Sequence, residues 1–309
     1  MAVDLSPIDE SLLATIANIH GMPKGAFNIR RDGQLVERHN SAYIEIQTKT
    51  GVPGIDIFIK PGTKGESVFI PVIVTQSGLK DVVYNTFYVG EDCDVEIIAG
   101  CGIHNDSHKA SEHDGIHTFY IGKNSRVKYI EKHYGEGEGT GERILNPTTD
   151  VYMEENSFCE MEMVQLRGVS STVRETKASL KDKAKLVLTE RLLTHDDQMA
   201  TSNVKIELEG DDSSVQVVSR SVAQDRSVQV FNPLVVGKAA CRGHVQCDAI
   251  IMGDARVKSI PGIEAVSPDA ILMHEAAIGK IAGDQIIKLM TLGLSEEEAE
   301  QEILDDFLS

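Results

Sequence analysis

The residues best suited to chemistry lie near the C-terminal end of the chain. Cys247 stands in the segment QCDA, and His274 and Glu275 follow in the segment MHEA, 27 and 28 residues later. Thiolate, imidazole and carboxylate are the side-chain groups that bind transition metals. We therefore interpret Cys247, His274 and Glu275 as candidate metal ligands. On spacing alone, however, the favoured interpretation is that Cys247 is a small buried hydrophobe and His274 a hydrogen-bonded core histidine.

The five cysteines form neither a disulfide framework nor an electron-transfer site. The sequence has no CxxC, and the pairs Cys93/Cys101 and Cys241/Cys247 match no ferredoxin spacing. The low, odd count predicts a reducing, cytoplasmic environment. Cys101 continues the alternation of the apolar residues before it, so we expect it to face inward. We interpret Cys93 and Cys159 as packing residues.

A histidine-rich segment lies in the first half of the chain, with His104, His108, His113 and His117 at spacings of four, five and four. These spacings are irregular for a strand and the segment is polar, although it could bind a metal. We therefore interpret it as a solvated connection. His117 opens the apolar run HTFYIG and is the member expected to be structural.

From about Gln34 onward the chain consists of short runs rich in Val, Ile and Tyr. These runs must position the candidate functional residues. A polar turn followed by a small or branched apolar residue recurs every 25 to 32 residues. The opening residues are Ala42, Val68, Val95, Val127, Cys159, Ala184, Val215, Val245 and Ala270. This pattern predicts a mostly β chain folded as a parallel β-solenoid, and an irregular β-sandwich is the alternative.

The predicted register relates the candidate ligands to one another. Side chains alternate between the two faces of a strand, and parallel coils stack about 4.8 Å apart. Cys247 and His274 are therefore expected on the same side of the solenoid, about one coil apart. Glu275 and Asp248 are expected to point the other way.

Helices are predicted at both ends. Ser6–His20 has a cap at Ser6 and an apolar stripe, and Gly21 and Pro23 should end it. After Glu275 the apolar period becomes helical up to Gly293, with the stripe Ile278, Ile281, Ile286, Leu289 and Met290. Ser295 and Glu298 form a capping box that opens a final helix.

These elements predict three segments. Residues 1–33 form an N-terminal helical segment, residues 34–275 the solenoid core, and residues 276–309 a small helical domain. The net charge of −18 argues against binding to nucleic acid or to an anionic membrane surface. No apolar run approaches the ~20 residues that span a bilayer.

The C-terminal sequence HEAAIGKIAGDQIIKLMTLGLSEEEAEQEILDDFL resembles the SufB/SufD family of iron–sulfur cluster assembly proteins. The segment QCDAIIMGDARVKSIPGIE resembles another family segment, and AGCGIHNDSHKASEHDGIH is a weaker match. The resemblance implies a right-handed parallel β-helix core with a helical C-terminal domain. It also implies that two cores pair and that the C-terminal helices bind SufC, an ABC-type ATPase.

The resemblance further implies roles for particular residues. Cys247, His274 and Glu275 match the residues implicated in assembling a cluster at the dimer interface. Cys101 matches, less securely, the interior cysteine of the G-C segment, a further candidate for holding the cofactor or accepting its sulfur. Few thiolates supplemented by imidazole and carboxylate suit a scaffold that must release a transient cluster.

The chain is shorter than a typical SufB, with a reduced N-terminal region. We therefore expect a compact SufB-like homodimer, in a two-plus-two complex with the ATPase, served by sulfur donors and by proteins that accept the finished cluster. The docking region is expected at 280–309.

We expect no catalytic activity in the chain itself. The segment GEGEGTG lacks the lysine and the strand–helix setting of a phosphate-binding loop and is interpreted as a flexible loop. Two alternatives stay open: a purely structural subunit that binds no metal, and a β-helix carbohydrate-active enzyme. The absence of aromatic sugar platforms argues against the second.

Overall fold

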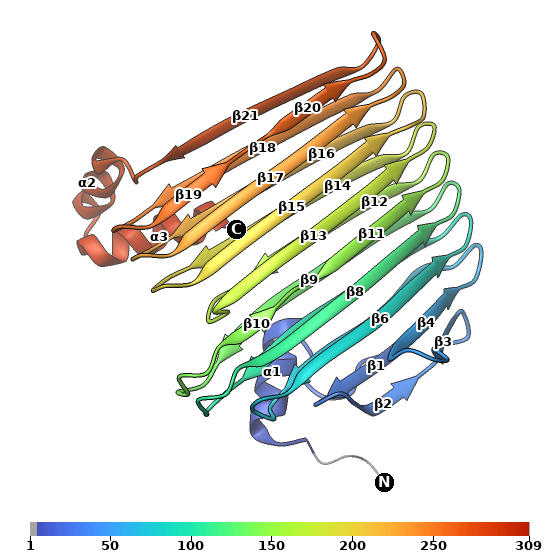
Figure 1. Cartoon of the computed structure of the whole chain (residues 1–309), viewed down its shortest axis with the longest axis horizontal. Helices are drawn as coiled ribbons and strands as arrows, with labels where there is room; N and C mark the ends of the chain where they lie inside the picture. The colour runs from blue at the N-terminus through green and yellow to red at the C-terminus, as the bar shows by residue number, and fades with distance from the viewer. Residues whose placement is uncertain (1–4, 309) are drawn as a thin grey trace.

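The computed structural model describes residues 5–308, so residues 1–4 and 309 of the predicted terminal segments lie outside it. The chain forms a β-solenoid of about eight turns, with one helix near the N-terminus and two at the C-terminus (Figure 1). The predicted fold class is confirmed. No helix within the described residues is long and apolar enough to cross a membrane.

Two sheets form the walls of the solenoid. The first, sheet A, contains in spatial order β2 (Gln34–His39), β1 (Ala26–Arg31), β5 (Lys64–Val74), β7 (Asp94–His104), β9 (Arg126–Glu136), β12 (Phe158–Gln165), β14 (Lys185–Thr194), β16 (Ser214–Ala223), β18 (Arg242–Ile251) and β21 (Ile271–Gly279). Sheet B contains β19 (Arg256–Ser259), β17 (Val228–Gly237), β15 (Met199–Leu208), β13 (Ser171–Leu180), β10 (Arg143–Leu145), β8 (Ser111–Ile121), β6 (Lys80–Val89), β4 (Gly54–Ile59) and β3 (Ile44–Thr48). Two further strands belong to sheet B, namely β11 (Thr148–Met153), between β8 and β13, and β20 (Gly262–Ala265), beside β17.

Successive coils pair in parallel, and the N-terminal end is different. There, β1 with β2 and β3 with β4 are antiparallel pairs, which place β2 and β3 at the edges of the two sheets. At the C-terminal end the parallel strands β21 and β19 occupy the corresponding edges.

The predicted repeat is visible in the register of sheet A. Val95, Val127 and Cys159 lie directly opposite one another on neighbouring strands. Ala184 precedes the matching residue of its coil, Leu186, by two positions, which preserves the alternation of faces. Ala42 precedes β3 in sheet B and does not belong to this column.

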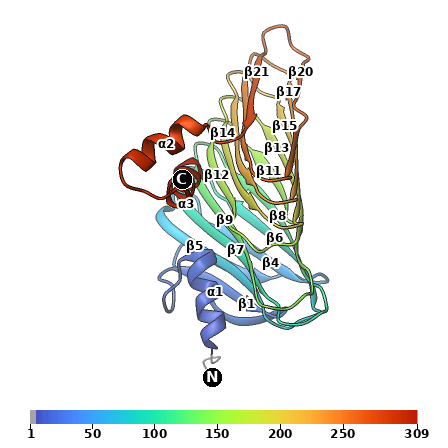
Figure 2. The ribbon, with the colours of Figure 1, turned by 90° about the vertical axis from the view of Figure 1, so that its left-hand side faces the viewer.

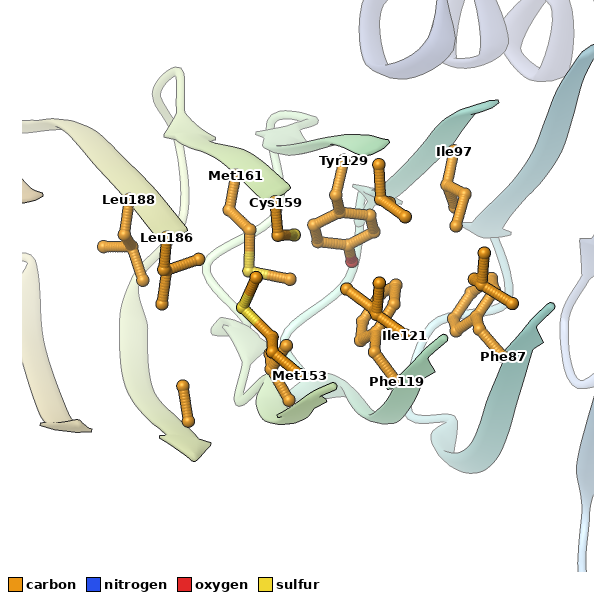
Figure 3. Close-up of a cluster of buried hydrophobic side chains, with 14 of the residues drawn as sticks. Phe87, Ile97, Phe119, Ile121, Tyr129, Met153, Cys159, Met161, Leu186 and Leu188 are labelled. Atoms are coloured by element: carbon orange, nitrogen blue, oxygen red, sulfur yellow. The ribbon is translucent and has the colours of Figure 1, made fainter. Parts of the chain in front are cut away.

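One continuous apolar core runs between the two sheets. Ile97, Tyr129 and Met161 point inward from sheet A, toward Phe87 and Phe119 from sheet B (Figure 3). Phe87 and Phe119 are stacked, with ring centroids 4.4 Å apart. Aliphatic residues, Met and stacked Phe fill the narrow interior of a chain that contains no Trp.

Helix α1 (Pro7–Ala17) begins with the predicted cap. The backbone nitrogen of Asp9 donates to Ser6 Oγ at 3.2 Å, and the backbone nitrogen of Ser6 donates to Asp9 Oδ2 at 2.8 Å. The helix ends three residues earlier than predicted, because Asn18 adopts the left-handed conformation with φ of 52°. Gly21 and Pro23 therefore lie beyond the helix and do not end it.

Helix α1 packs against the outer face of sheet A through Leu12, Leu13 and Ile16. Two outward-facing glycines of β7, Gly100 and Gly102, allow this close approach. A Cβ on Gly100 would lie 2.7 Å from the carbonyl oxygen of Ile16. The helix thus lies directly behind the cysteine that stands between these two glycines.

The C-terminal helices are α2 (Gly283–Thr291) and α3 (Glu296–Leu308). The predicted capping box of α3 is confirmed by reciprocal hydrogen bonds between Ser295 and Glu298. Leu304 packs on Val222 and Ile250 of sheet A. Ile278 lies in β21, so its predicted place in a helical stripe was wrong: the strand continues to Gly279 because residues up to Ile250 of β18 pair with it.

All three helices lie on the side of sheet A (Figure 2). Helix α2 contacts α3 and has no buried residue. Its apolar residues Ile287 and Met290, and Leu292 just beyond it, are exposed. The helical region therefore presents an uncovered apolar surface.

Residues 137–141 of the glycine-rich segment form a loop, as predicted, whereas Gly135 and Glu136 belong to β9. The loop follows the preceding corner of the solenoid so closely that side chains have no room. A Cβ on Gly139 would lie 2.4 Å from the backbone nitrogen of Ser107, and one on Gly141 would lie 2.2 Å from the carbonyl oxygen of Lys109. Glycine here permits close stacking of two corners.

The three segments 1–33, 34–275 and 276–309 stay a proposed division. Strand β1 of sheet A lies within the first of them, and β21 continues four residues into the third.

Candidate functional site

Strands β18 and β21 place the candidate ligands at the C-terminal end of the solenoid. His274 pairs with Val245, and Glu275 pairs with Gln246. Val245 and Cys247 are both buried and face the interior, so His274 occupies an inward position displaced by two residues from Cys247. Strand spacing and rise put the two Cα atoms roughly 8 Å apart.

Cys247 is 3 % exposed and lies beside Ser259 of β19. Burial raises the pKa of the Cys247 thiol, and the negative charges of Asp248 and Glu190 add to that effect, while the neighbouring Ser259 hydroxyl opposes it. An isolated subunit therefore keeps Cys247 mainly as the neutral thiol. A bound cation would favour the thiolate.

Glu275 lies on the outer face of sheet A. Its Oε1 is 3.1 Å from Nε2 of His244, and both side chains are exposed or partly exposed to solvent. His274 is also exposed, because no further coil covers β21. Cys247 and His274 thus share the inner side, while Glu275 points away from them.

The three predicted ligands do not converge within one subunit. Within residues 5–308, the group of three potential ligand atoms lying within 4.8 Å of one another is His195, Asp196 and Asp225, at an exposed corner. His195 Nδ1 lies 2.7 Å from Asp196 Oδ2, so these side chains are already engaged with each other.

A column of inward positions leads from Cys247 back along sheet A. Each member pairs with the next on a neighbouring strand, in the order Cys247, Ser219, Glu190, Met163 and Glu131. Two buried carboxylates in a solenoid interior are unusual, since charged groups are rarely buried without partners.

The partners of these carboxylates come mainly from sheet B. Arg174 Nη1 donates to Glu131 Oε2 at 2.5 Å, and Tyr129 Oη donates to Glu131 Oε1 at 3.0 Å. Glu190 Oε1 accepts a hydrogen bond from Ser202 Oγ at 2.8 Å and lies 3.9 Å from Arg174 Nε. Arg174 therefore bridges the two carboxylates.

The charges in this network differ between its members. Burial opposes ionisation of Glu131, but Arg174 and His133 overcome it and hold the pKa of Glu131 well below its usual range. Burial dominates at Glu190 and raises its pKa, despite the opposing effect of Arg174. The interior thus contains a fixed ion pair beside a carboxyl that more readily holds a proton.

The far end of the network reaches Cys101. Cys101 pairs in register with His133 on β9, and its side chain lies beside the imidazoles of His113 and His133. Cys101 faces inward as predicted and is 6 % exposed.

The histidine-rich segment is only partly a solvated connection. His113 and His117 are buried on β8, whereas His104 is partly exposed and His108 exposed. The interpretation was wrong for His113, because the alternation Ser111, His113, Gly115, His117 continues into the core. A period of two across SEHDGIHTF was the signal that could have located these buried histidines.

Comparisons with known proteins identify a matching family and several relatives. The family described as SUF system FeS cluster assembly, SufBD core domain, matches residues 74–307. An iron–sulfur cluster assembly SufBD family protein from Archaeoglobus fulgidus is 25 % identical over 276 residues, 89 % of this chain and 73 % of the relative. One from Methanocaldococcus jannaschii is 25 % identical over 291 residues, 93 % of this chain and 90 % of the relative.

The match begins at the last residue of β5 and extends almost to the end of α3. It thus includes the strands that position Cys101 and Cys247, together with the edge strand β21 and both C-terminal helices. The chain belongs to the SufBD family of iron–sulfur cluster assembly proteins.

Proposed function

We propose that this chain is a SufB-like scaffold that forms a homodimer through the C-terminal ends of its solenoids and builds a transient iron–sulfur cluster there. Family membership gives the chain a role in iron–sulfur cluster assembly. The observation that carries the finer proposal is the position of Cys247, one strand from an uncovered edge, with His274 exposed on that edge.

The uncovered edge has the properties of a subunit interface. Ile271 and Met273 of β21 are more than half exposed, and Ile263 and Val266 near the edge of sheet B are also exposed. Exposed apolar side chains beside an unpaired strand favour pairing with another chain. A second copy related by a two-fold axis brings a second Cys247 and His274 to the same place.

In such a dimer Glu275 could contribute to the cluster-binding site although it points away from Cys247 within one subunit. Ligands supplied by two chains need not converge within either of them. In the proposed dimer, Cys247, His274 and Glu275 contribute one thiolate, one imidazole and one carboxylate per subunit. Such a mixed set binds a cluster less firmly than four thiolates do and suits its release.

The C-terminal helices are the proposed docking site for ABC-type ATPases, with residues 280–309 as the contact region. Family membership suggests such partners in general. Helix α2 presents its apolar side to solvent, while α3 is held on sheet A by Leu304. ATP hydrolysis then takes place in the partner, and a two-plus-two complex follows from the proposed dimer.

Sulfur is proposed to enter at Cys101 and to reach Cys247 through the solenoid interior. The buried polar groups from His133 through Glu131, Arg174 and Glu190 support this route, because an apolar core would exclude a charged sulfur species. The sulfur donor and the proteins that accept the cluster lie outside the chain. A cytoplasmic location fits the few free thiols.

The test is anaerobic reconstitution with iron and sulfide. The wild-type protein should gain an oxygen-sensitive visible absorption, and Cys247→Ser should lose it. Cys159→Ser is the matched control, because Cys159 is a buried thiol on the same inner face but distant from the edge. A Cys247→Ser protein that binds iron and sulfide as well as the control overturns the site assignment.

The two other candidate functions are weaker. A purely structural subunit predicts no iron binding in that same assay. Aromatic residues do form a ladder on sheet B, where Phe58, Tyr88, Tyr120 and Tyr152 stack with centroids 4.9 to 5.5 Å apart. The rings cover one another's faces, so the ladder offers sugars no row of open platforms.

A further inference from the structure

The outer face of sheet B carries a ladder of four stacked aromatic rings. Phe58, Tyr88, Tyr120 and Tyr152 lie directly opposite one another on β4, β6, β8 and β11. Their ring centroids are 4.9, 5.5 and 5.2 Å apart, and neighbouring ring planes are at most 13° from parallel. The ring spacing follows the stacking of the coils, so each ring covers one face of the next.

The ladder stops at Tyr152. The residue in register with Tyr152 on the next strand, β13, is Ser179, and the one after it on β15 is Glu207. Tyr120 covers one face of the Tyr152 ring. Because the rings stack along the direction in which the coils follow one another, the other face is directed toward a coil that has no ring.

A small cavity occupies the position of the missing ring. Its volume is about 200 Å³, and its lining includes Tyr152, Ser179 and Glu207 from three successive coils. Pockets that take drug-sized molecules measure roughly 300–1,000 Å³, so this cavity suits a single planar group. Strand spacing places the Cα atoms of Tyr152 and Glu207 about 9.6 Å apart. A ring stacked ~5 Å from the Tyr152 ring therefore lies midway between them, above Ser179.

Two lysines flank this position. Lys177 on β13 and Lys205 on β15 are register partners, and both line the cavity. Lys205 Nζ lies 2.8 Å from Glu207 Oε1 and Lys238 Nζ lies 2.7 Å from Glu207 Oε2, so the charge of Glu207 is compensated. Lys177 forms no ion pair or hydrogen bond with another described residue. The remaining charged residue of the lining, Asp150, lies on β11 in the coil of Tyr152.

We propose that the cavity over Ser179 binds a planar aromatic molecule that carries an acidic group and stacks on Tyr152 as the next rung of the ladder. The ring of this molecule covers the open face of Tyr152, and its acidic group lies beside Lys177, on the side away from Asp150. The site goes beyond the proposed scaffold function, because it lies on the outer face of sheet B whereas Cys247 faces the interior from sheet A.

The ladder favours an aromatic ligand over an aliphatic one. Stacked rings attract each other beyond the effect of burial alone. Tyr120 already holds the Tyr152 ring in its stacked orientation, so binding costs little further side-chain freedom. Two sources share the required chemistry: an aromatic carboxylic acid, and a nucleotide, whose base supplies the ring and whose phosphate supplies the acidic group.

The first experiment titrates the full-length protein with indole-3-acetate and measures saturation transfer from the protein to the indole protons by NMR. We expect saturable binding with a dissociation constant on the order of 1 mM, as ordinary ligand efficiency gives for a molecule of this size. Cyclohexaneacetate carries the same acidic group on a ring that is not aromatic and should bind severalfold more weakly. Equal affinity for the two acids overturns the stacking.

Ser179→Tyr places the missing ring on the protein itself and should abolish the binding of indole-3-acetate. Ser171→Tyr is the matched control, because Ser171 is another outward-facing serine of β13. This control should bind the ligand as the wild-type protein does. Equal binding by the two variants places the ligand elsewhere and overturns the proposal.

Tyr152→Leu tests the same site without adding a ring. It keeps an apolar side chain but removes the stacking face, so affinity for indole-3-acetate should fall about two- to tenfold. Tyr84→Leu is its control, because Tyr84 is an exposed tyrosine of sheet B that does not belong to the ladder. An unchanged affinity in a folded Tyr152→Leu protein contradicts the proposal.

Lys177→Gln tests recognition of the acidic group. Affinity for indole-3-acetate should fall by up to about fivefold, while affinity for uncharged indole should not change. Lys123→Gln, which alters an exposed lysine at a distant corner, should affect neither ligand. If Lys177→Gln prefers the acid to indole as strongly as the wild-type protein does, Lys177 has no part in binding.

Competition with AMP distinguishes the two sources. Displacement of indole-3-acetate by AMP assigns the site to nucleotides, and binding of indole-3-acetate without displacement assigns it to aromatic carboxylic acids. A protein that binds neither molecule overturns the proposal, and this result leaves the cluster-assembly function untouched.

Discussion

At the scale of single residues, the interior of this solenoid depends on compensation of buried charge. Arg174 is the cation shared by Glu131 and Glu190, and all three side chains are buried. Removing one member of a buried pair leaves its partner uncompensated, which costs more than the pair itself contributes.

We therefore expect Arg174→Met to lower the free energy of unfolding by about 3–5 kcal/mol, measured by urea denaturation. The double variant Glu131→Gln/Arg174→Met should lose less than the single one, because only Glu190 then lacks its arginine, and burial already raises the pKa of that carboxyl. Arg226→Met is the matched control, since Arg226 pairs with Asp197 in full contact with solvent and should change little. Equal effects at the two arginines would contradict the explanation.

The pH dependence of stability follows from the lowered pKa of Glu131. A carboxyl whose pKa is lower in the folded than in the unfolded state stabilises the fold. This stabilisation is complete at a pH above the pKa of the unfolded state, about 4.3. That contribution disappears as pH falls through the lower folded pKa. The stability difference between wild type and Glu131→Gln should be complete at pH 7 and shrink below about pH 4. A difference that stays constant to pH 2 would show that charge is not its source.

At the scale of elements, helix α1 packs closely on strand β7 because β7 has glycine where the two elements touch. Gly100→Ala forces a Cβ against the backbone of Ile16, and overpacking of this kind costs about 1–3 kcal/mol. Thermal unfolding should detect the loss. Gly279→Ala is the control, because a Cβ there meets no atom within 4 Å. Equal melting temperatures for both variants would show that α1 adjusts freely.

A substitution in helix α2 should affect binding of a partner and not the stability of the fold. Ile287→Asp on its exposed face should leave the melting temperature unchanged and abolish co-purification with a co-expressed SufC-type ATPase. Ile8→Asp on α1 provides a control, because Ile8 is also an exposed apolar residue of a helix. Retention of the ATPase by Ile287→Asp would place the docking surface elsewhere.

The sequence predicted the order of the strands, and the side of the sheet to which each side chain points, better than it predicted contacts between the two sheets. Val95, Val127 and Cys159 follow a fixed repeat, because parallel coils add nearly constant lengths of chain. Arg174 and Glu131 are 43 residues apart on opposite sheets. Their meeting depends on the lengths of the corners, which no periodic pattern encodes. The prediction that Ile278 belongs to a helix failed for a related reason, because apolar residues at the end of a strand can also fit a helical period.

The sequence likewise predicted one part of the candidate site and not the other. The shared side of Cys247 and His274 follows from alternation along paired strands, and the structure places both residues on inward positions. The Cys101–His113 neighbourhood requires a strand of sheet A to face a strand of sheet B. The alternation of residues in β8 could have indicated that His113 and His117 are buried, but it could not indicate which residues of sheet A they face.

At the scale of the whole molecule, the two ends of the solenoid are chemically different. Ile271→Asp/Met273→Asp places charge on the exposed edge and should convert the proposed dimer into a monomer of 33.7 kDa, as measured by light scattering. Val173→Asp, at an exposed apolar position of sheet B, should leave the dimer intact. A variant of β21 that remains dimeric would exclude this edge as the interface.

The antiparallel strands at the N-terminal end have a consequence for assembly size. A solenoid with two similar ends could add copies indefinitely and grow into a filament. Here β2 and β3 turn the chain back on itself at one end, and only the other presents the last parallel coil. Once two copies meet through that end, neither has another like it to offer, so growth stops at the pair.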